Sequence, residues 1–274
     1  FDAASRGRYA TDASIYQVDP VGVVVPADEA DVVAAIDLAR EMRVPILPRG
    51  GGTSQCGQTV GEALVIDNSR NLNKVIAFDA QARTVEVQPG IVLDHLNAYL
   101  KPHGLWFPVD VSTSAQATIG GMAGNNSCGS RSIAYGNMVH NVLGIEAILS
   151  DGVSEYFGPF GVNAGRAMAS GRAGELVAQL CALGARERDE IARVWPKVLR
   201  RVGGYNLDVF NPQSERPYTD DGSVNLAHLL VGSEGTLGYF RRLVLKLSPL
   251  PKARVLGVVN FPPFWAAMAS AQHI

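Results

Sequence analysis

Cysteine is scarce in this chain, and its scarcity excludes one class of site. The three cysteines among 274 residues are Cys56, Cys128 and Cys181, and no two of them form a CxxC pair. Iron–sulfur and zinc clusters need several cysteine or histidine ligands at short spacing, so we expect no such cluster in this chain. Three widely separated cysteines also indicate reduced thiols, as in a cytosolic protein.

Excess charge and long apolar runs are missing as well. The formal net charge is −2 and the lysines and arginines are scattered, so we expect no nucleic-acid partner. No apolar run approaches the ~18 residues that a membrane span needs, so we expect no transmembrane segment. The first residue is Phe1, and no charged-then-apolar leader follows it, so we expect no signal peptide.

Glycine is abundant, with 29 residues, and its longest run follows a predicted strand. Residues 31–43 have the periodicity of an amphipathic helix, and the apolar residues 44–47 are typical of a short strand. The motif PRGGGTS at 48–54 therefore stands at a strand's exit. Residues without Cβ can turn their N–H groups toward one anion, as phosphate loops do. A flexible surface loop is the alternative for a bare triple glycine.

The predicted elements indicate an α+β protein with two lobes. A β-branched run at 21–26, the segment 63–67 and the alternating segment 84–90 are expected to be strands, and 92–100 a helix. Together with the βαβ unit around the first motif, these elements predict a small α/β lobe over residues 1–103.

A larger, mainly antiparallel lobe with helices is expected over residues 104–250. Its expected strands are 142–149, 155–157, 228–231 and 242–247. A helical region is expected over 174–202, which includes Leu199, with a kink or a new start at Pro196. Residues 251–274 add a predicted strand at 255–261 and a helix from Phe264. We interpret this last segment as the start of a third, cap domain.

Two further glycine-rich motifs lie in the larger lobe. They read ATIGGMAGNNSCG at 117–129 and GSEGTLG at 232–238, and each is interpreted as a loop beside a predicted element. Neither of them, nor the first motif, has the spacing of a Rossmann dinucleotide turn or of a nucleoside triphosphate loop. Three such loops fit a long, pyrophosphate-containing ligand that is held along its length.

In combination, the three motifs resemble flavoproteins of the vanillyl-alcohol oxidase and p-cresol methylhydroxylase (PCMH) type, over about residues 10–250. The resemblance is to the branch that contains D-lactate dehydrogenases, D-2-hydroxyglutarate dehydrogenases and glycolate oxidase, including members fused to an iron–sulfur domain. It implies an FAD-binding fold of two lobes. It also implies non-covalent FAD, because Thr53 stands where some relatives attach the cofactor through a histidine.

The same resemblance implies which residues bind FAD. For the diphosphate they are Arg49, Gly50, Gly51, Gly52 and Thr53, with Ser54 and Gly57 beside them. For the ribityl and isoalloxazine parts they are Asp110, Thr118, Gly121, Gly124, Asn125 and Ser127. The third motif and the residues that follow it add Glu234, Gly235 and Phe240. Arg49, Thr53 and Ser54 can also supply charge and hydroxyl donors from their side chains.

The implied reaction is hydride transfer from a D-2-hydroxy acid, of the D-lactate, D-2-hydroxyglutarate or glycolate class, to N5 of FAD. A quinone, a cytochrome or an iron–sulfur domain would accept the electrons. The resemblance leaves the catalytic base, any metal and any cluster to a cap domain or other part outside this chain. It implies a cytoplasmic protein, either free or peripheral to the inner membrane. A cell-wall-type FAD reductase and a flavin module without a substrate site are the alternatives.

Several single residues receive no catalytic role. The histidines, which share no i, i+4 metal spacing, are His95, His103, His140, His228 and His273. Glu234, between glycines, is expected to make a polar contact with the cofactor. Tyr205 lies either near the flavin or in the core, and Cys128 is expected to be a buried, unreactive thiol.

Overall fold

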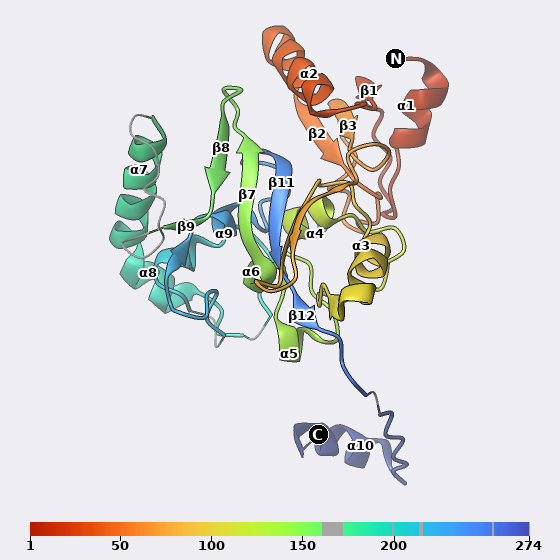
Figure 1. Cartoon of the computed structure of the whole chain (residues 1–274), viewed down its shortest axis with the longest axis vertical. Helices are drawn as coiled ribbons and strands as arrows, with labels where there is room; N and C mark the ends of the chain where they lie inside the picture. The colour runs from red at the N-terminus through yellow and green to blue at the C-terminus, as the bar shows by residue number, and fades with distance from the viewer. Residues whose placement is uncertain (161–171, 199, 214–215, 254, 274) are drawn as a thin grey trace.

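A computed structural model of the chain describes residues 1–160, 172–198, 200–213, 216–253 and 255–273 (Figure 1). Its first unit is a parallel sheet in which the central strand β3 (Leu64–Asp67) pairs with β1 (Gly22–Val24) and β2 (Ile46–Arg49). The helix α2 (Glu29–Met42) connects β1 to β2 and buries the apolar stripe Val32, Ala35, Ile36 and Ala39. This arrangement confirms the predicted βαβ unit.

The ends of α2 are defined by its sequence. Asp28 precedes the helix, and its carboxylate accepts hydrogen bonds from the N–H groups of Ala30 and Asp31, at 2.8 and 3.1 Å. Arg43 follows the helix in the left-handed conformation, with φ of 55°, and the chain turns there toward β2. The helix therefore delivers the chain into β2 and, at its end, into the first glycine motif.

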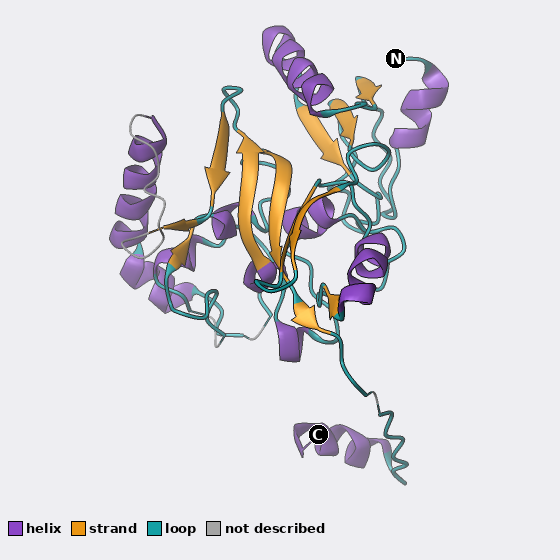
Figure 2. Ribbon diagram, in the orientation of Figure 1, coloured by secondary structure: helices purple, strands orange, loops and turns teal. Residues whose placement is uncertain are grey.

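A five-stranded antiparallel sheet forms the centre of the molecule (Figures 1 and 2). Its strands, in spatial order, are β4 (Val75–Asp79), β5 (Thr84–Val87), β11 (Tyr239–Lys246), β7 (Val142–Ile148) and β8 (Ser154–Phe157). The strand β11 pairs with β5 on one side and β7 on the other. The prediction that residues 84–90 belong to the small lobe is therefore wrong, because their hydrogen bonds go to β11.

The remaining elements cover the sheets or lie at the edge of the molecule. They are α1 (Ala3–Tyr9), α3 (Leu93–Leu100), η1 (Lys101–His103), β6 (Leu105–Trp106), α4 (Ile119–Asn125), α5 (Ser132–Tyr135), α6 (Met138–Asn141), β9 (Pro159–Phe160), α7 (Arg172–Arg186), α8 (Arg188–Val194), η2 (Leu207–Phe210), β10 (Val224–Asn225), α9 (Ala227–Leu230), β12 (Ser248–Pro249), α10 (Phe264–Ser270) and η3 (Ala271–His273). In the view of Figures 1 and 2, α7 and α8 lie to the left of the central sheet, beyond β8, and α3 lies to its right.

Two hydrophobic clusters form the core. The larger one joins the central sheet to α3, α4 and α9 through residues such as Val87, Leu96 and Leu243. The smaller one joins α2 to the parallel sheet, and it also takes in Ile148 of β7 and Tyr239 of β11. The Tyr239 hydroxyl donates to Oδ1 of Asn68, at 2.6 Å, so the lobes are joined by apolar packing and by a buried hydrogen bond.

The predicted α+β class is confirmed, but three predicted elements are wrong. Residues 228–231, expected to be a strand, lie mostly in α9, because a short apolar run does not distinguish a strand from a buried helix. The second glycine motif, expected to be a loop, contains α4. Residues 255–261 form no strand, and their apolar side chains, such as Val255, are exposed and have no neighbouring strand.

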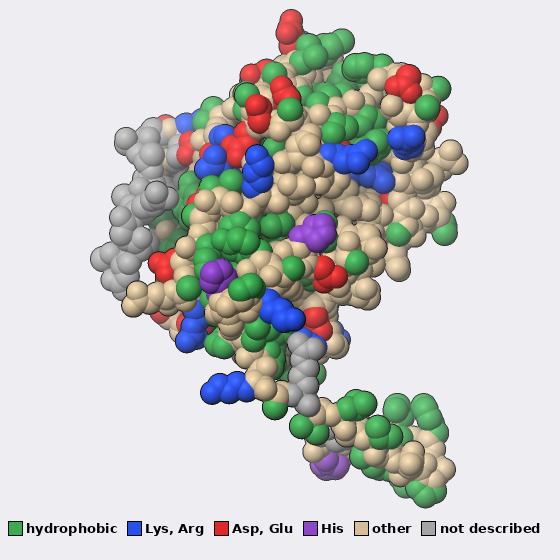
Figure 3. All heavy atoms as spheres, turned by 45° about the vertical axis from the view of Figure 1, so that its right-hand side comes forward, with side chains coloured by type: hydrophobic (Ala, Val, Ile, Leu, Met, Phe, Trp, Pro, Cys, Tyr) green, Lys and Arg blue, Asp and Glu red, His purple; other side chains and the backbone are tan. Residues whose placement is uncertain are grey.

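Other predicted helices and strands agree with the structure more closely. The helical region expected over 174–202 is confirmed only in part. The helices α7 and α8 cover it as far as Val194, residues 195–198 and 200–202 are not helical, and Leu199 lies outside the described residues. The helix predicted from Phe264 is α10, which stands apart from the main body with apolar side chains on its surface (Figures 1 and 3). In the described part of the chain, no helix has both the length and the apolar character to cross a membrane.

Candidate functional site

All three glycine motifs line one cavity of about 440 Å³. The predicted FAD-binding residues on its wall are Arg49, Gly50, Gly51, Gly52, Thr53, Ser54, Thr118, Gly121, Gly124, Asn125, Ser127, Glu234, Gly235 and Phe240. Gly57 and Asp110 are the two predicted residues that do not line it. A cavity of this size is in the range of small-molecule and cofactor sites.

The first motif presents backbone donors that the protein itself does not use. We call residues 50–54 the cradle. Among the described residues, none of the five cradle N–H groups donates a hydrogen bond to the protein. The adjoining carbonyls do have partners, since Arg49 accepts from the Asn68 N–H, at 2.9 Å, and Gly52 from the Ala13 N–H, at 3.0 Å. Unpaired donors on a cavity wall are suited to an anionic ligand.

The triple glycine is required by close packing as well as by backbone shape. A Cβ on Gly50 would lie 1.9 Å from Oγ1 of Thr118, and a Cβ on Gly51 would lie 2.2 Å from the carbonyl oxygen of Gln116. Gly52 has a φ of +64°, which disfavours residues with a side chain. The cradle therefore rests directly on residues 116–118, and this packing excludes a free surface loop.

The second motif contributes through α4. Gly120 allows α4 to pack closely against Pro89, because a Cβ on Gly120 would be 2.6 Å from Cβ of Pro89. The helix ends at Asn126, which adopts the left-handed conformation with φ of 52°. The Asn126 side chain is buried, and its Oδ1 accepts from the Val139 N–H at 3.1 Å. Asn126 therefore ends α4, whereas the side chain of Asn125 donates a hydrogen bond to Glu234.

Glu234 of the third motif forms hydrogen bonds with the second motif and with Gln58, which follows the first motif. Its N–H donates to the Gly124 carbonyl at 2.9 Å, and its carboxylate Oε1 accepts from Nδ2 of Asn125 at 2.9 Å. The amide of Gln58, just after the cradle, also donates to Oε1, at 3.4 Å. Glu234 therefore connects the third motif to the second motif and to Gln58, and its predicted contact with a cofactor stays a prediction.

The two residues outside the cavity serve the surrounding chain. Gly57 has a φ of +79°, and a Cβ there would come within 2.6 Å of the Tyr16 ring. The Asp110 carboxylate accepts from Oγ of Ser130, at 2.9 Å, and from the Arg131 N–H, at 3.1 Å. Asp110 thus orders the segment that follows the second motif.

Three other residues differ from what their sequence context indicates. Tyr205 is 41% exposed, does not line the cavity, and its hydroxyl is 2.7 Å from Oγ1 of Thr236. Cys128 is only half-buried and lies on the cavity wall, so its prediction as a buried thiol is wrong. The Arg49 guanidinium donates three hydrogen bonds to carbonyl groups of the protein, two from Nη1 and one from Nη2.

Two histidines with a shifted pKa, the buried His228 and the half-buried His140, lie elsewhere. Burial lowers the pKa of both His140 and His228 to about 4, so both rings are neutral at neutral pH. Neither ring lines the cavity, and His228 Nε2 is 3.0 Å from the Val142 carbonyl oxygen. Within the described residues, no group of three or more His, Cys, Asp or Glu side chains is arranged to hold a metal ion.

Further cavity residues were missed by sequence reasoning. They are Pro48, Gln55, Cys56, Gln58, Thr59, Asn68, Pro89, Val111, Ser112, Thr113, Ala117, Gly120, Met122, Asn126, Cys128 and Val202. The hydroxyl run Ser112-Thr113-Ser114, immediately ahead of the second motif, was a signal that could have found part of this wall. Asn68 and Val202 had no such signal, because only the fold brings them to the cavity.

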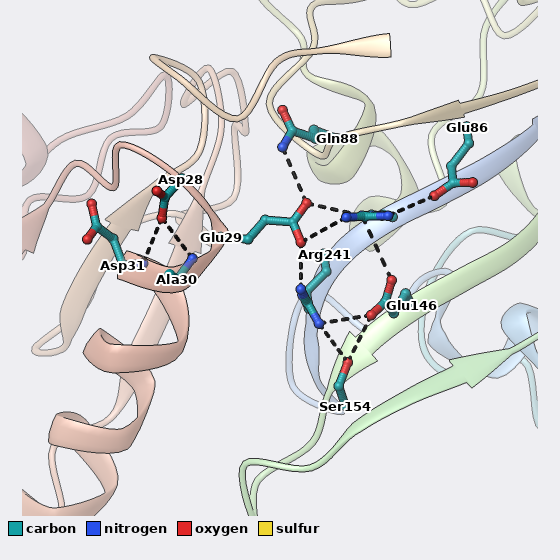
Figure 4. A network of polar contacts seen from close by, with 10 residues as sticks. Asp28, Glu29, Ala30, Asp31, Glu86, Gln88, Glu146, Ser154 and Arg241 are labelled. Atoms are coloured by element: carbon teal, nitrogen blue, oxygen red, sulfur yellow. Dashed lines mark hydrogen bonds and ion pairs between the residues drawn. The ribbon is translucent and has the colours of Figure 1, made fainter. Parts of the chain in front are cut away.

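An ion-pair network joins the two lobes (Figure 4). Glu29, at the start of α2, accepts from Arg241 at 2.6 Å and from Arg242 at 3.1 Å, both on β11. The arginines also pair with Glu146 of β7 and Glu86 of β5, at 2.9 and 3.6 Å. Burial would raise the pKa of Glu29, but the bonds from Arg242 and Arg241 outweigh it and hold that pKa below its ordinary value.

Known proteins resemble this chain in sequence and in fold. Residues 20–155 match the family model described as FAD binding domain. D-2-hydroxyglutarate dehydrogenases of Pseudomonas putida and Escherichia coli are 36% and 35% identical, over 100% and 98% of this chain. Glycolate oxidase subunit GlcD of Bacillus subtilis is 29% identical over 93% of the chain. The chain spans about a quarter of the length of the two dehydrogenases, 27% and 26%.

A solved structure of alkyldihydroxyacetonephosphate synthase has the same fold. It is 20% identical, with a TM-score of 0.60 over 92% of this chain and 38% of its own. The fold and the three motifs around one cavity define an FAD-binding domain of the PCMH type. The chain belongs to the PCMH-type flavoprotein family that its sequence resembles, and FAD is the cofactor of that domain.

Proposed function

We propose that this chain is the FAD-binding part of a dehydrogenase that oxidises a D-2-hydroxy acid. The cradle carries the proposal, because five adjacent backbone donors without partners in the described protein stand on the wall of a cavity. Four relatives named D-2-hydroxyglutarate dehydrogenase, at 34–36% identity, support that acid as the first substrate to test. D-Lactate and glycolate follow, from the names of more distant relatives.

The donor set fits the parts of FAD. The N–H groups of Gly50 to Ser54 would bind the diphosphate, and the polar side chains of Thr118, Asn125 and Ser127 would face the rest of the cofactor. Thr53 offers no covalent attachment, so FAD would bind reversibly. When bound, FAD accepts the hydride, and the protein supplies position and a polar wall.

The base and the groups that bind the substrate carboxylate are proposed to lie outside this chain. Among the described cavity residues, Glu234 and Arg49 are the charged ones, and both are held by protein partners. No histidine of the described chain lines the cavity. We place the missing groups in a cap domain of the full-length protein, of which residues 251–274 would be the start. The electron acceptor would be a quinone, a cytochrome or an iron–sulfur domain, and the protein would be cytoplasmic or peripheral to the inner membrane.

The first test is FAD binding by the purified chain. Titration of the flavin-free protein should quench FAD fluorescence with saturation, and acid precipitation should then leave all flavin in the supernatant. Absence of saturable binding would contradict the proposal, and flavin in the pellet would contradict reversible attachment. Riboflavin is the matched probe, since it lacks the diphosphate and should bind much more weakly.

The second test separates the alternative functions. The full-length protein should be reduced by D-2-hydroxyglutarate without oxygen, seen as loss of flavin absorbance. Reduction by NADPH alone would favour the cell-wall-type reductase. Reduction by dithionite, but by none of the three acids or NADPH, would favour a flavin module without its own substrate site.

A further inference from the structure

Arg49 belongs to the first motif, yet its guanidinium lies behind the cradle. Its Nη1 donates to the carbonyl oxygens of Tyr9 and Thr59, at 3.1 and 3.0 Å, and its Nη2 donates to that of Thr11, at 2.8 Å. A Cβ on Gly52 would be 2.6 Å from the same Nη2. The side chain is therefore packed directly against the backbone of the cradle, and both Nη1 hydrogens are already in use.

Two of the three acceptors belong to a segment that covers the back of the motif. We call residues 9–16 the strap. The Ala13 N–H donates to the Gly52 carbonyl at 3.0 Å, and Asp12 Oδ2 accepts from Oγ1 of Thr59 at 2.8 Å. The Tyr9 hydroxyl donates to Oδ2 of Asp67, at 2.6 Å, at the end of β3. The strap is thus bonded to the cradle, to the chain beyond it and to the sheet beneath it.

Arginine is the residue that this geometry requires. Three carbonyl oxygens from separate residues surround one guanidinium, and its planar fork presents several donors at fixed angles. The Tyr9 ring stacks on the group as well, 5.3 Å from the guanidinium carbon to the ring centroid. A lysine would keep the positive charge but lacks the fork, so the two residues can be told apart by experiment.

We propose that Arg49 is a positioning residue for the FAD diphosphate. It fastens the strap beneath the cradle and thereby holds residues 50–54 in the shape that leaves their N–H groups free. It does not bind the phosphate itself. The identity of the anion rests on the proposed function, whereas the fastening of the strap is a property of the flavin-free chain.

Arg49→Lys and Arg49→Met test the proposal together. Both should weaken FAD binding about tenfold or more and to a similar extent, because both lose the fork. In the flavin-free protein, both should also speed amide hydrogen exchange at Ala13 and Val18, which donate to Gly52 and Ala10 in the wild type. Arg193→Lys is the matched control, since Arg193 is exposed and pairs only with Glu190 among the described residues, and it should change neither quantity.

Three results would overturn the proposal. The first is FAD affinity within about threefold of wild type for Arg49→Lys together with a large loss for Arg49→Met, because charge alone would then suffice. The second is weaker FAD binding with unchanged exchange in the strap, which would make Arg49 a direct ligand. The third is unchanged FAD affinity in both variants.

The exchange measurement keeps the two proposals separate. If wild-type protein binds no FAD, the proposed function fails, while faster exchange in the Arg49 variants still supports the fastening of the strap and unchanged exchange contradicts it. If neither Arg49 variant folds, Asp12→Ala takes its place, because it removes the bond from Thr59 and leaves Arg49 intact. Faster exchange and severalfold weaker FAD binding are expected, and no change in either would refute the role of the strap.

Discussion

The cradle and the ion-pair network between the lobes differ in whether the protein supplies partners for their polar groups. In the cradle, side chains are absent from the three glycines, and five backbone donors have no partner among the described residues. In the network, each carboxylate oxygen of Glu29 accepts from an arginine, and Oε1 also accepts from Gln88 at 3.4 Å. Polar groups of a folded chain normally find partners in the protein, so unpaired donors on a cavity wall are left for solvent or for a ligand. In the network, by contrast, the protein itself supplies the partners of the Glu29 carboxylate.

The largest effect is expected when a carboxylate enters the cradle. Gly51→Asp should lower FAD affinity by about 100-fold or more, because it adds like-charge repulsion to a diphosphate and removes charge-assisted hydrogen bonds. Its Cβ would also meet the Gln116 carbonyl at 2.2 Å. Fluorescence titration measures the loss. Gly257→Asp is the matched control, because a Cβ at Gly257 meets nothing within 4 Å, and it should bind FAD like the wild type.

Breaking the network should act on stability more than on binding. Glu29→Gln leaves Arg241 and Arg242 without their main partner and should cost ~1–2 kcal/mol of unfolding free energy in urea. Asp37→Asn is the matched control, because it breaks only an exposed pair with Arg40 and should cost less than ~0.5 kcal/mol. Equal losses in the two variants would show that the network is no more than a surface feature.

Acid should weaken the fold in two stages. His140 and His228 have a pKa of about 4 when folded, against an ordinary 6.5, so the unfolded chain takes up protons first as the pH falls. Their contribution to stability is therefore complete above pH 6.5 and is lost between 6.5 and about 4. Glu29, with a pKa held below 4.5, adds a loss at still lower pH, which Glu29→Gln should reduce. Urea midpoints that stay constant from about pH 7 to about pH 5 would contradict the first stage.

The smallest effect is expected at Tyr205. Tyr205→Phe removes one bond to Thr236 on an exposed side chain, so it should change the unfolding free energy by less than ~0.5 kcal/mol. FAD affinity should stay within about twofold of wild type, because Tyr205 does not line the cavity. A tenfold loss of affinity would restore the alternative in which Tyr205 lies near the flavin.

Local sequence signals predicted what depends on neighbours along the chain. The amphipathic helix predicted at 31–43 and the strands predicted at 142–149 and 155–157 follow from patterns within a few residues, and they are present as α2, β7 and β8. The strand exit at the cradle was likewise visible. The helix α4 was missed because its glycines lower helix propensity, and the packing of Gly120 against Pro89 could not be seen in the sequence.

Contacts between distant residues could not be predicted. The Glu29–Arg241 bond joins residues 212 positions apart, and the pairing of β5 with β11 also depends on the complete fold. The direction of a side chain could not be predicted either. The position of Arg49 in a glycine motif indicated that its side chain would bind the ligand, but its guanidinium forms hydrogen bonds with the strap. Most of the predicted FAD-binding residues are brought to one cavity, but their contacts with FAD stay a prediction.

Amide hydrogen exchange of Gly50 to Ser54, with and without FAD, tests the central claim most directly. These five N–H groups have no partner in the described protein, so they should exchange quickly in the flavin-free chain. Saturating FAD should slow their exchange by about tenfold or more, while riboflavin, which lacks the diphosphate, should not. Saturable FAD binding with unchanged exchange across residues 50–54 would show that the diphosphate lies elsewhere.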